Sequence, residues 1–142
     1  MQKFLIFISE QWLLVSLLSA AVVALAWLEN RRAGPSLTSQ ALTNMVNREE
    51  AIIIDLRDKA DFDAGHIVDA INLPFNQWQS QHNSDEDGLF QQFKEKPIIL
   101  VCKLGQQSTF AAKRLQRDSG PAVYRLSGGI MEWKAAQMPL IQ

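Results

Sequence analysis

Apolar and polar residues form blocks along the chain, and the first long apolar block differs from all the others. Residues 12–28 contain no charged side chain, and Ser16 and Ser19 are their only hydroxyl groups. At about 1.5 Å per residue a helix over this block is roughly 25 Å long, slightly short of a ~30 Å hydrocarbon core. Trp12 and Trp27 lie at its two ends, as is typical of membrane interfaces. The block therefore predicts one N-terminal transmembrane helix.

The same block has two other interpretations, a cleaved signal peptide and a buried core helix. The sequence "ALA" at 24–26 resembles a small-residue cleavage site, whereas a core helix is rarely apolar on every face. Only Lys3 supplies a positive side chain before the block, and the arginine pair at 31–32 follows it. Because cytoplasmic flanks are enriched in Lys and Arg, we expect residues 1–34 to be an uncleaved anchor in the inner (plasma) membrane. This orientation places the N-terminus outside and residues 35–142 in the cytoplasm.

Beyond the anchor, short apolar runs alternate with stretches of helical period. The apolar runs, which predict strands covered on both faces, are 51–57, 70–74, 97–102 and 122–128. The stretches with helical spacing are 37–46, 59–64, 89–96, 107–120 and 129–137. Residues 76–88 are polar, and we expect a loop or a frayed helix there. The alternation predicts an α/β domain over 35–142, with a parallel sheet between helical layers.

The charge balance and the single cysteine narrow the partners and the compartment. The chain has 14 Lys and Arg residues against 15 Asp and Glu, a formal net charge of −1 at pH 7. We therefore expect no nucleic-acid partner. Cys102 is the one cysteine, so no disulfide forms within the chain, which fits a reducing compartment.

Cys102 ends the apolar run at 97–102, directly before a loop and a predicted helix. Ligands of parallel α/β sheets bind beyond the carboxyl ends of the strands, and helix N-termini offer unpaired N–H groups. Gly105 allows a close turn, and Ser108 is placed to cap the helix or to bind an anion. We expect the amides of 103–108 to surround a solvent-facing sulfur and to favour its thiolate or persulfide form. The alternative is an inert cysteine that packs as a small hydrophobe.

Three motifs in this order resemble the rhodanese family of sulfurtransferases over residues 36–140. "CKLGQQS" at 102–108 resembles the active-site loop of the family, in which the cysteine carries the transferred sulfur. The upstream segment resembles the family at Asp55, Arg57, Phe62, Gly65, His66, Ile67, Ala70, Asn72 and Pro74. The C-terminal segment does so at Leu126, Gly128, Gly129, Trp133 and Pro139. The resemblance implies a rhodanese-like parallel sheet with helices on both faces, and an anchored single domain is similar to small membrane-bound rhodanese-like proteins of bacteria.

The resemblance also implies a thiosulfate sulfurtransferase-like activity at the membrane surface. Sulfane sulfur would pass from thiosulfate or a persulfide, through a persulfide on Cys102, to cyanide or a thiol. The substrate-binding residues implied are Lys103, Leu104, Gly105, Gln106, Gln107, Ser108 and Arg57. No metal and no organic cofactor is implied. The alternative is a non-catalytic, membrane-tethered module that binds a membrane or cytoplasmic protein.

Several residues have a structural interpretation as well. We expect Asp55 and Arg57 to form an ion pair that holds neighbouring loops; a role for Arg57 in binding an anionic donor is the alternative. We expect His66 to orient the chain and not to catalyse. Asp69 and Gln137 stand where relatives usually have glycine, a difference that we interpret as structural.

The loop also departs from related sites. Its sixth position, often arginine in relatives, is Gln107, which removes a cation near the substrate. Position 108 is serine, so the Cys-x5-Arg clamp of related phosphatases is absent. Position 105 is glycine, which excludes a thioredoxin-like Cys-x-x-Cys motif.

Overall fold

The structure is a computed structural model of the chain. It describes residues 11–32, 34–49, 51–83, 93, 95–117 and 122–142. The chain divides into two compact units, Met1–Arg32 and Ala33–Gln142.

The first unit contains one long helix, α2, at Trp12–Arg32. Its large apolar side chains are exposed on all sides, and the hydroxyl groups of Ser16 and Ser19 bond back to carbonyl oxygens one turn earlier. Within the part of the chain that the structure describes, no helix combines the length and the apolar content that crossing a membrane requires. The helix itself was expected, but its transmembrane role has no support from this structure and stays a prediction.

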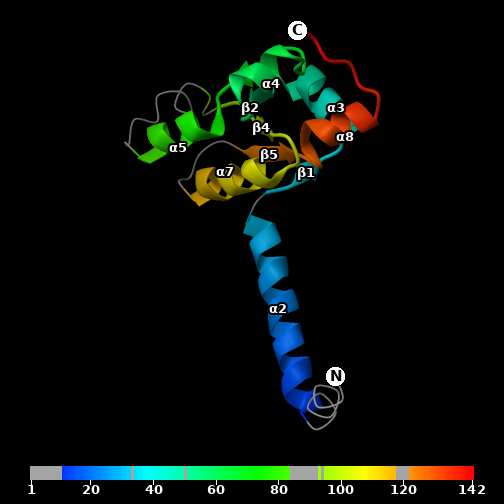
Figure 1. The fold of residues 1–142 in the computed structure, drawn as a ribbon, viewed down its shortest axis with the longest axis vertical. Helices are drawn as coiled ribbons and strands as arrows, with labels where there is room; N and C mark the ends of the chain where they lie inside the picture. Colours follow the sequence, from blue (N-terminus) through cyan, green and yellow to red (C-terminus); the bar gives the residue numbers. More distant parts are fainter. Residues whose placement is uncertain (1–10, 33, 50, 84–92, 94, 118–121) are drawn as a thin grey trace. The chain divides into compact units, whose positions relative to one another are not determined.

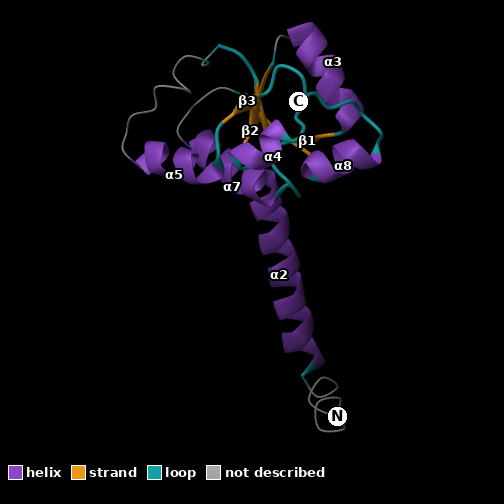
Figure 2. Ribbon diagram, turned by 45° about the horizontal axis from the view of Figure 1, so that its top comes forward, coloured by secondary structure: helices purple, strands orange, loops and turns teal. Residues whose placement is uncertain are grey.

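The second unit is built on a five-stranded, fully parallel sheet of order β1-β5-β4-β2-β3 (Figures 1 and 2). The strands are β1 at Ser36–Leu37, β2 at Ile52–Asp55, β3 at Ile71–Asn72, β4 at Ile98–Val101 and β5 at Val123–Leu126. Four of them lie within the predicted apolar runs. The fifth, β1, was missed, and Leu37 was wrongly assigned to a helix, because a two-residue edge strand has no period to detect.

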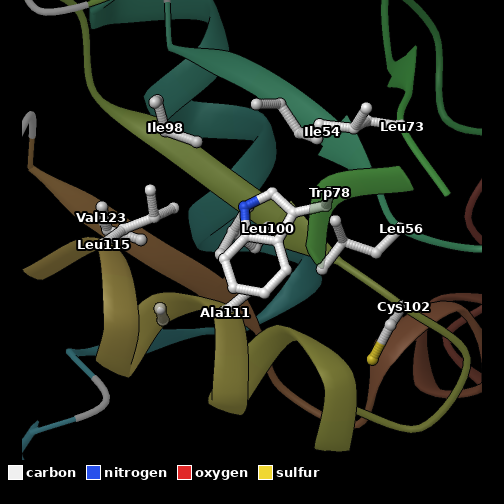
Figure 3. Close-up of a cluster of buried hydrophobic side chains, with 11 residues drawn as sticks. Ile54, Leu56, Leu73, Trp78, Ile98, Leu100, Cys102, Ala111, Leu115 and Val123 are labelled. Carbon is white, nitrogen blue, oxygen red and sulfur yellow. The ribbon is translucent and has the colours of Figure 1, made fainter. Parts of the chain in front are cut away.

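Side chains on the two faces of the sheet form two separate cores. Ile98 and Leu100 pack on one face against Trp78 and Ala111, whereas Ile99 packs with residues of the other face. This alternation explains why the strand sequence is apolar at every position. Figure 3 shows the first cluster, with Cys102 at one end of it and Ile98 toward the other.

Helices cover both faces, as predicted. They are α3 at Ser39–Glu49, α4 at Lys59–Asp63, α5 at Phe75–Asn83, α7 at Gln106–Arg117 and α8 at Gly129–Ala135. Part of the segment expected to be a loop or a frayed helix is therefore the ordered helix α5. The helix expected over 89–96 falls mostly outside the described residues, as do residues 84–88 and 118–120.

Two residues hold backbone conformations that favour glycine. Asp69 has φ 61° and Gln137 has φ 55°, both in the left-handed region. These are the two positions at which the resemblance implied glycine. Their conformations fit the structural interpretation of that difference.

Candidate functional site

Cys102 directly follows β4, the middle strand of the sheet. Ile98, Leu100 and Cys102 share one face because side chains alternate along a strand, so the cysteine continues the buried row. Its side chain is only 1% exposed. The expectation that the sulfur faces solvent is therefore wrong. The thiol reaches the edge of the core at the base of a pocket.

The sulfur lies within a turn of backbone amides. The amide of Gly105 donates a hydrogen bond to Sγ at 3.0 Å, and the amide of Ser108 does so at 3.5 Å. The Ser108 hydroxyl oxygen lies 3.4 Å from Sγ and accepts from the thiol. Ser108 is in the first turn of α7, so the sulfur accepts a hydrogen bond from an N–H group that has no partner inside the helix. Two such donors, together with the positive end of the helix, favour negative charge on sulfur.

Gly105 and Ser108 shape this turn from within. Gly105 has φ 95°, a conformation that side-chain-bearing residues rarely adopt. Its carbonyl oxygen accepts bonds from the Ser108 hydroxyl at 3.0 Å and from both the amide and the hydroxyl of Thr109. Ser108 is fully buried. The Ser108 hydroxyl therefore closes the turn by donating to Gly105 and accepts from the thiol, while its predicted roles as a helix cap or an anion donor stay predictions.

The start of α8 holds the carbonyl side of the same loop. The amide of Ile130 donates to the Cys102 carbonyl at 2.8 Å, and the amide of Met131 donates to the Lys103 carbonyl at 3.2 Å. These two bonds attach the start of α8 to the backbone of Cys102 and Lys103. A Cβ on Gly129 would lie 2.3 Å from the Cys102 carbonyl oxygen, so only glycine fits there.

A pocket of about 310 Å³ opens above the sulfur. Its lining residues are Arg57, Asp58, Asp61, Cys102, Lys103, Leu104, Gln106 and Gln107. The structure thus brings the predicted Arg57 to the predicted loop, while Gly105 and Ser108 contact the sulfur without lining this pocket. The two aspartates were not predicted as site residues. A signal for them existed, because they follow β2, and the carboxyl ends of β2 and β4 meet at one edge of the sheet.

Arg57 forms the predicted ion pair with Asp55. The Arg57 Nη2 lies 2.7 Å from Asp55 Oδ2, and the two side chains are 5% and 1% exposed. Nε also donates to Asp55, and the guanidinium further bonds the carbonyl oxygens of Asp61 and Gly65. Four of its five N–H groups therefore connect the end of β2 with α4 and with Gly65, which follows α4. One Nη1 N–H group has no acceptor among the described residues.

His66 has structural partners. Its ring stacks on Phe62 at 3.8 Å, Nδ1 lies 3.0 Å from the Phe62 carbonyl oxygen, and its backbone pairs with Ile141. These contacts fit the expected orienting role. Among the residues that the structure describes, no group of three His, Cys, Asp or Glu side chains is placed to hold a metal ion.

The chain is similar to known proteins over most of this unit. The family model "Rhodanese-like domain" matches residues 38–136. The chain is 31% identical over 106 residues to the uncharacterized protein YibN of Escherichia coli K12, covering 75% of this chain and 71% of that protein. It is 31% identical over 91 residues to the thiosulfate sulfurtransferase GlpE of Coxiella burnetii, covering 64% and 78%. A rhodanese-related protein from Thermoplasma volcanium has a similar structure, with a TM-score of 0.59, 20% identity, and coverage of 75% of this chain and 97% of that one.

Proposed function

The chain belongs to the rhodanese-like domain family, and from this premise we propose that it is a sulfurtransferase that carries sulfur on Cys102. The observation that carries the proposal is the position of Sγ, which accepts amide hydrogen bonds from Gly105 and Ser108 at the base of a pocket. A packed cysteine needs neither the amides nor the pocket. A sulfur that alternates between thiolate and persulfide needs the amides, because each form carries negative charge. It needs the pocket because the donor and the acceptor must reach it.

The first step loads the enzyme. The Cys102 thiolate attacks the outer sulfur of thiosulfate or of a low-molecular-weight persulfide. A bond forms between Sγ and that sulfur, the sulfur–sulfur bond of the donor breaks, and sulfite or a thiolate leaves with the bonding electron pair. The loop amides stabilise the negative sulfur that forms, in the manner of an oxyanion hole. Lys103, which lines the pocket, adds a positive charge near the donor.

The second step unloads it. A thiophilic acceptor, cyanide or a thiol, attacks the outer sulfur of the persulfide. The bond between the two sulfurs breaks, and Sγ returns to the thiolate form held by the Gly105 and Ser108 amides. Both steps are displacements at sulfur, so no external oxidant or reductant is consumed.

Loading of Cys102 tests the proposal directly. The purified full chain in mild detergent is incubated with thiosulfate or a persulfide, and its intact mass is measured. One added sulfur atom that a reductant removes, absent from Cys102→Ser, is expected. A mass that does not change with either donor contradicts the proposal.

A non-catalytic binding module is the second candidate. Leu104, Phe110 and Met131 are exposed apolar side chains on the active-site loop, α7 and α8, at 60%, 47% and 49% exposure. Exposed apolar side chains of this kind are found at protein-binding surfaces. The same mass measurement separates the two candidates, because a binding module has no need to accept sulfur.

We further propose that the N-terminal helix anchors the domain to the inner membrane, with the domain in the cytoplasm. The proposal rests on the sequence, because residues 12–28 carry no charge and Trp12 and Trp27 lie at the two ends of this block. The arginine pair at 31–32 supports the orientation. Local thinning of the bilayer would accommodate the short length.

Cell fractionation tests the anchor. The full chain is expected in the membrane fraction after a carbonate wash, and Leu18→Arg with Val22→Arg is expected to release it. Protease added to intact spheroplasts should leave the domain uncut. A wild-type chain found in the washed soluble fraction, or a domain digested in intact spheroplasts, contradicts the anchor or its orientation respectively.

A further inference from the structure

Two carboxylates line the same pocket as the sulfur. Asp58 and Asp61 come from the start of α4, whereas the rest of the lining, apart from Arg57, comes from Cys102 and the loop that follows it. The pocket therefore has two aspartates on one side and, at its base, Cys102, whose Sγ accepts the Gly105 and Ser108 amides.

Neither carboxylate has a structural partner in the described part of the chain. Asp58 precedes α4 but makes no side-chain capping bond, and both aspartates are exposed. The other two acids of this region are paired: Asp55 with Arg57, and Asp63 with Lys59. Asp58 and Asp61 are thus the acids that remain available to a ligand in the pocket.

The charges of the lining do not suit a small dianion. The charge of Arg57 is already balanced by Asp55. Lys103 is then one cation against two carboxylates. A doubly negative donor such as thiosulfate is attracted by Lys103 and by the amides around Sγ but repelled by the two aspartates. A donor with a negative sulfur and a nearby positive group would be attracted by the amides and by the aspartates.

We propose that the preferred sulfur donor is a small persulfide that carries a primary ammonium group close to its sulfur, and that Asp58 and Asp61 bind this ammonium. The proposal rests on the proposed sulfurtransferase function and specifies its substrate class. The pocket of about 310 Å³ accommodates a ligand of this size. The Cys102 thiolate forms a bond to the outer sulfur, the donor's sulfur–sulfur bond breaks, and the aminothiol leaves with the electron pair.

Two donors, one with the ammonium and one without it, test this. Cysteamine persulfide carries the ammonium, and N-acetylcysteamine persulfide replaces it with a neutral amide. The rate of sulfur loading onto Cys102 is followed by intact mass for the full chain. We expect cysteamine persulfide to load about three- to tenfold faster per unit concentration, as two partly screened ion pairs allow.

Matched variants assign the preference to the two aspartates. In the double variant Asp58→Asn, Asp61→Asn we expect the preference to fall to the part that the better leaving group of cysteamine persulfide supplies, and loading from thiosulfate to rise. Asp63→Asn, on the same helix but outside the pocket, is the control and should keep the wild-type preference. The donor comparison on the wild-type chain needs no variant, so it stands even if the double variant folds poorly.

The outcomes separate this inference from the function on which it rests. Equal loading by the two donors, or a preference that is the same in the double variant as in the wild type, overturns the ammonium-binding role and leaves the sulfurtransferase intact. Failure of every donor to load Cys102 overturns the proposed function, and the donor preference with it.

Discussion

Gly129 lies so close to Cys102 that a Cβ at Gly129 would stand 2.3 Å from the carbonyl oxygen of Cys102. The backbone of Gly129 also has φ 62°. The loop that begins at Cys102 and the start of α8 therefore pack backbone against backbone, and a side chain at position 129 would not fit between them. Through this contact a residue far from the cysteine in sequence lies against the backbone of Cys102 and Lys103, at the start of the loop.

Gly129→Ala is expected to slow sulfur loading strongly and to destabilise the fold. The backbone strain alone costs about 1–2 kcal/mol, and the contact displaces the loop carbonyls. Gly128→Ala is the matched control: its φ of 66° brings similar strain, but its Cβ would meet the Glu132 side chain and not the loop. Thermal melting and loading rates are measured on both. Equal loading rates in the two variants would show that the Gly129 contact does not position the loop.

The buried Asp55–Arg57 ion pair is expected to stabilise the fold. Arg57→Ala leaves a buried carboxylate without its partner, and the free energy of unfolding is expected to fall by about 3–5 kcal/mol. Lys59→Ala, in the exposed Lys59–Asp63 pair, should change it by less than about 1 kcal/mol. Denaturant unfolding measures both. If Arg57→Ala is as stable as the wild type and only its KM for the donor rises, the residue serves the substrate and not the fold.

Gln107 lines the pocket without a charge. Gln107→Arg is expected to raise kcat/KM for thiosulfate about three- to tenfold, because a guanidinium offers charge-assisted bonds to the anion. Gln40→Arg adds the same charge on α3, outside the pocket, and should leave thiosulfate use unchanged. A similar gain in both variants would indicate a general charge effect, and no gain in either would place the side chain of residue 107 away from the donor.

Much of the fold could be predicted from local pattern because the central strands are buried on both faces. Ile53 and Ile54, adjacent in sequence, belong to opposite cores, and that is what makes the run apolar throughout. The edge strand at Ser36–Leu37 is paired only with β5 and has no such pattern. Its position follows from the tertiary fold.

The site shows a similar division. The loop residues were identified because cysteine, glycine and serine at this spacing suit an anion. The burial of Cys102 was missed, because the polarity of the following residues masked the alternation that points its side chain inward. Asp58 and Asp61 were missed because they reach the cysteine only through the pairing of β2 with β4, a long-range contact.

Replacing the residues with left-handed backbone, Asp69 and Gln137, by glycine is expected to stabilise the protein. Gln137→Gly is expected to raise the free energy of unfolding by about 0.5–1 kcal/mol, since glycine adopts φ 55° without strain. Asp69→Gly should gain less, because aspartate tolerates this region better than glutamine. Gln137→Ala keeps the strain and serves as the control. An unfolding free energy for Gln137→Gly at or below that of Gln137→Ala would contradict the strain argument.

The central claim is that Cys102 is a sulfur carrier and not a packed hydrophobe, and intact mass with matched melting curves tests it most directly. The full chain treated with thiosulfate or cysteamine persulfide should gain one sulfur atom that a reductant removes. Cys102→Ser should gain no sulfur. It should melt close to the wild type, because the serine hydroxyl can accept the hydrogen bonds that the Gly105 and Ser108 amides donate to Sγ in the wild type. A wild-type chain that gains no sulfur, with a serine variant that melts several degrees lower, would contradict the account and identify Cys102 as part of the core alone.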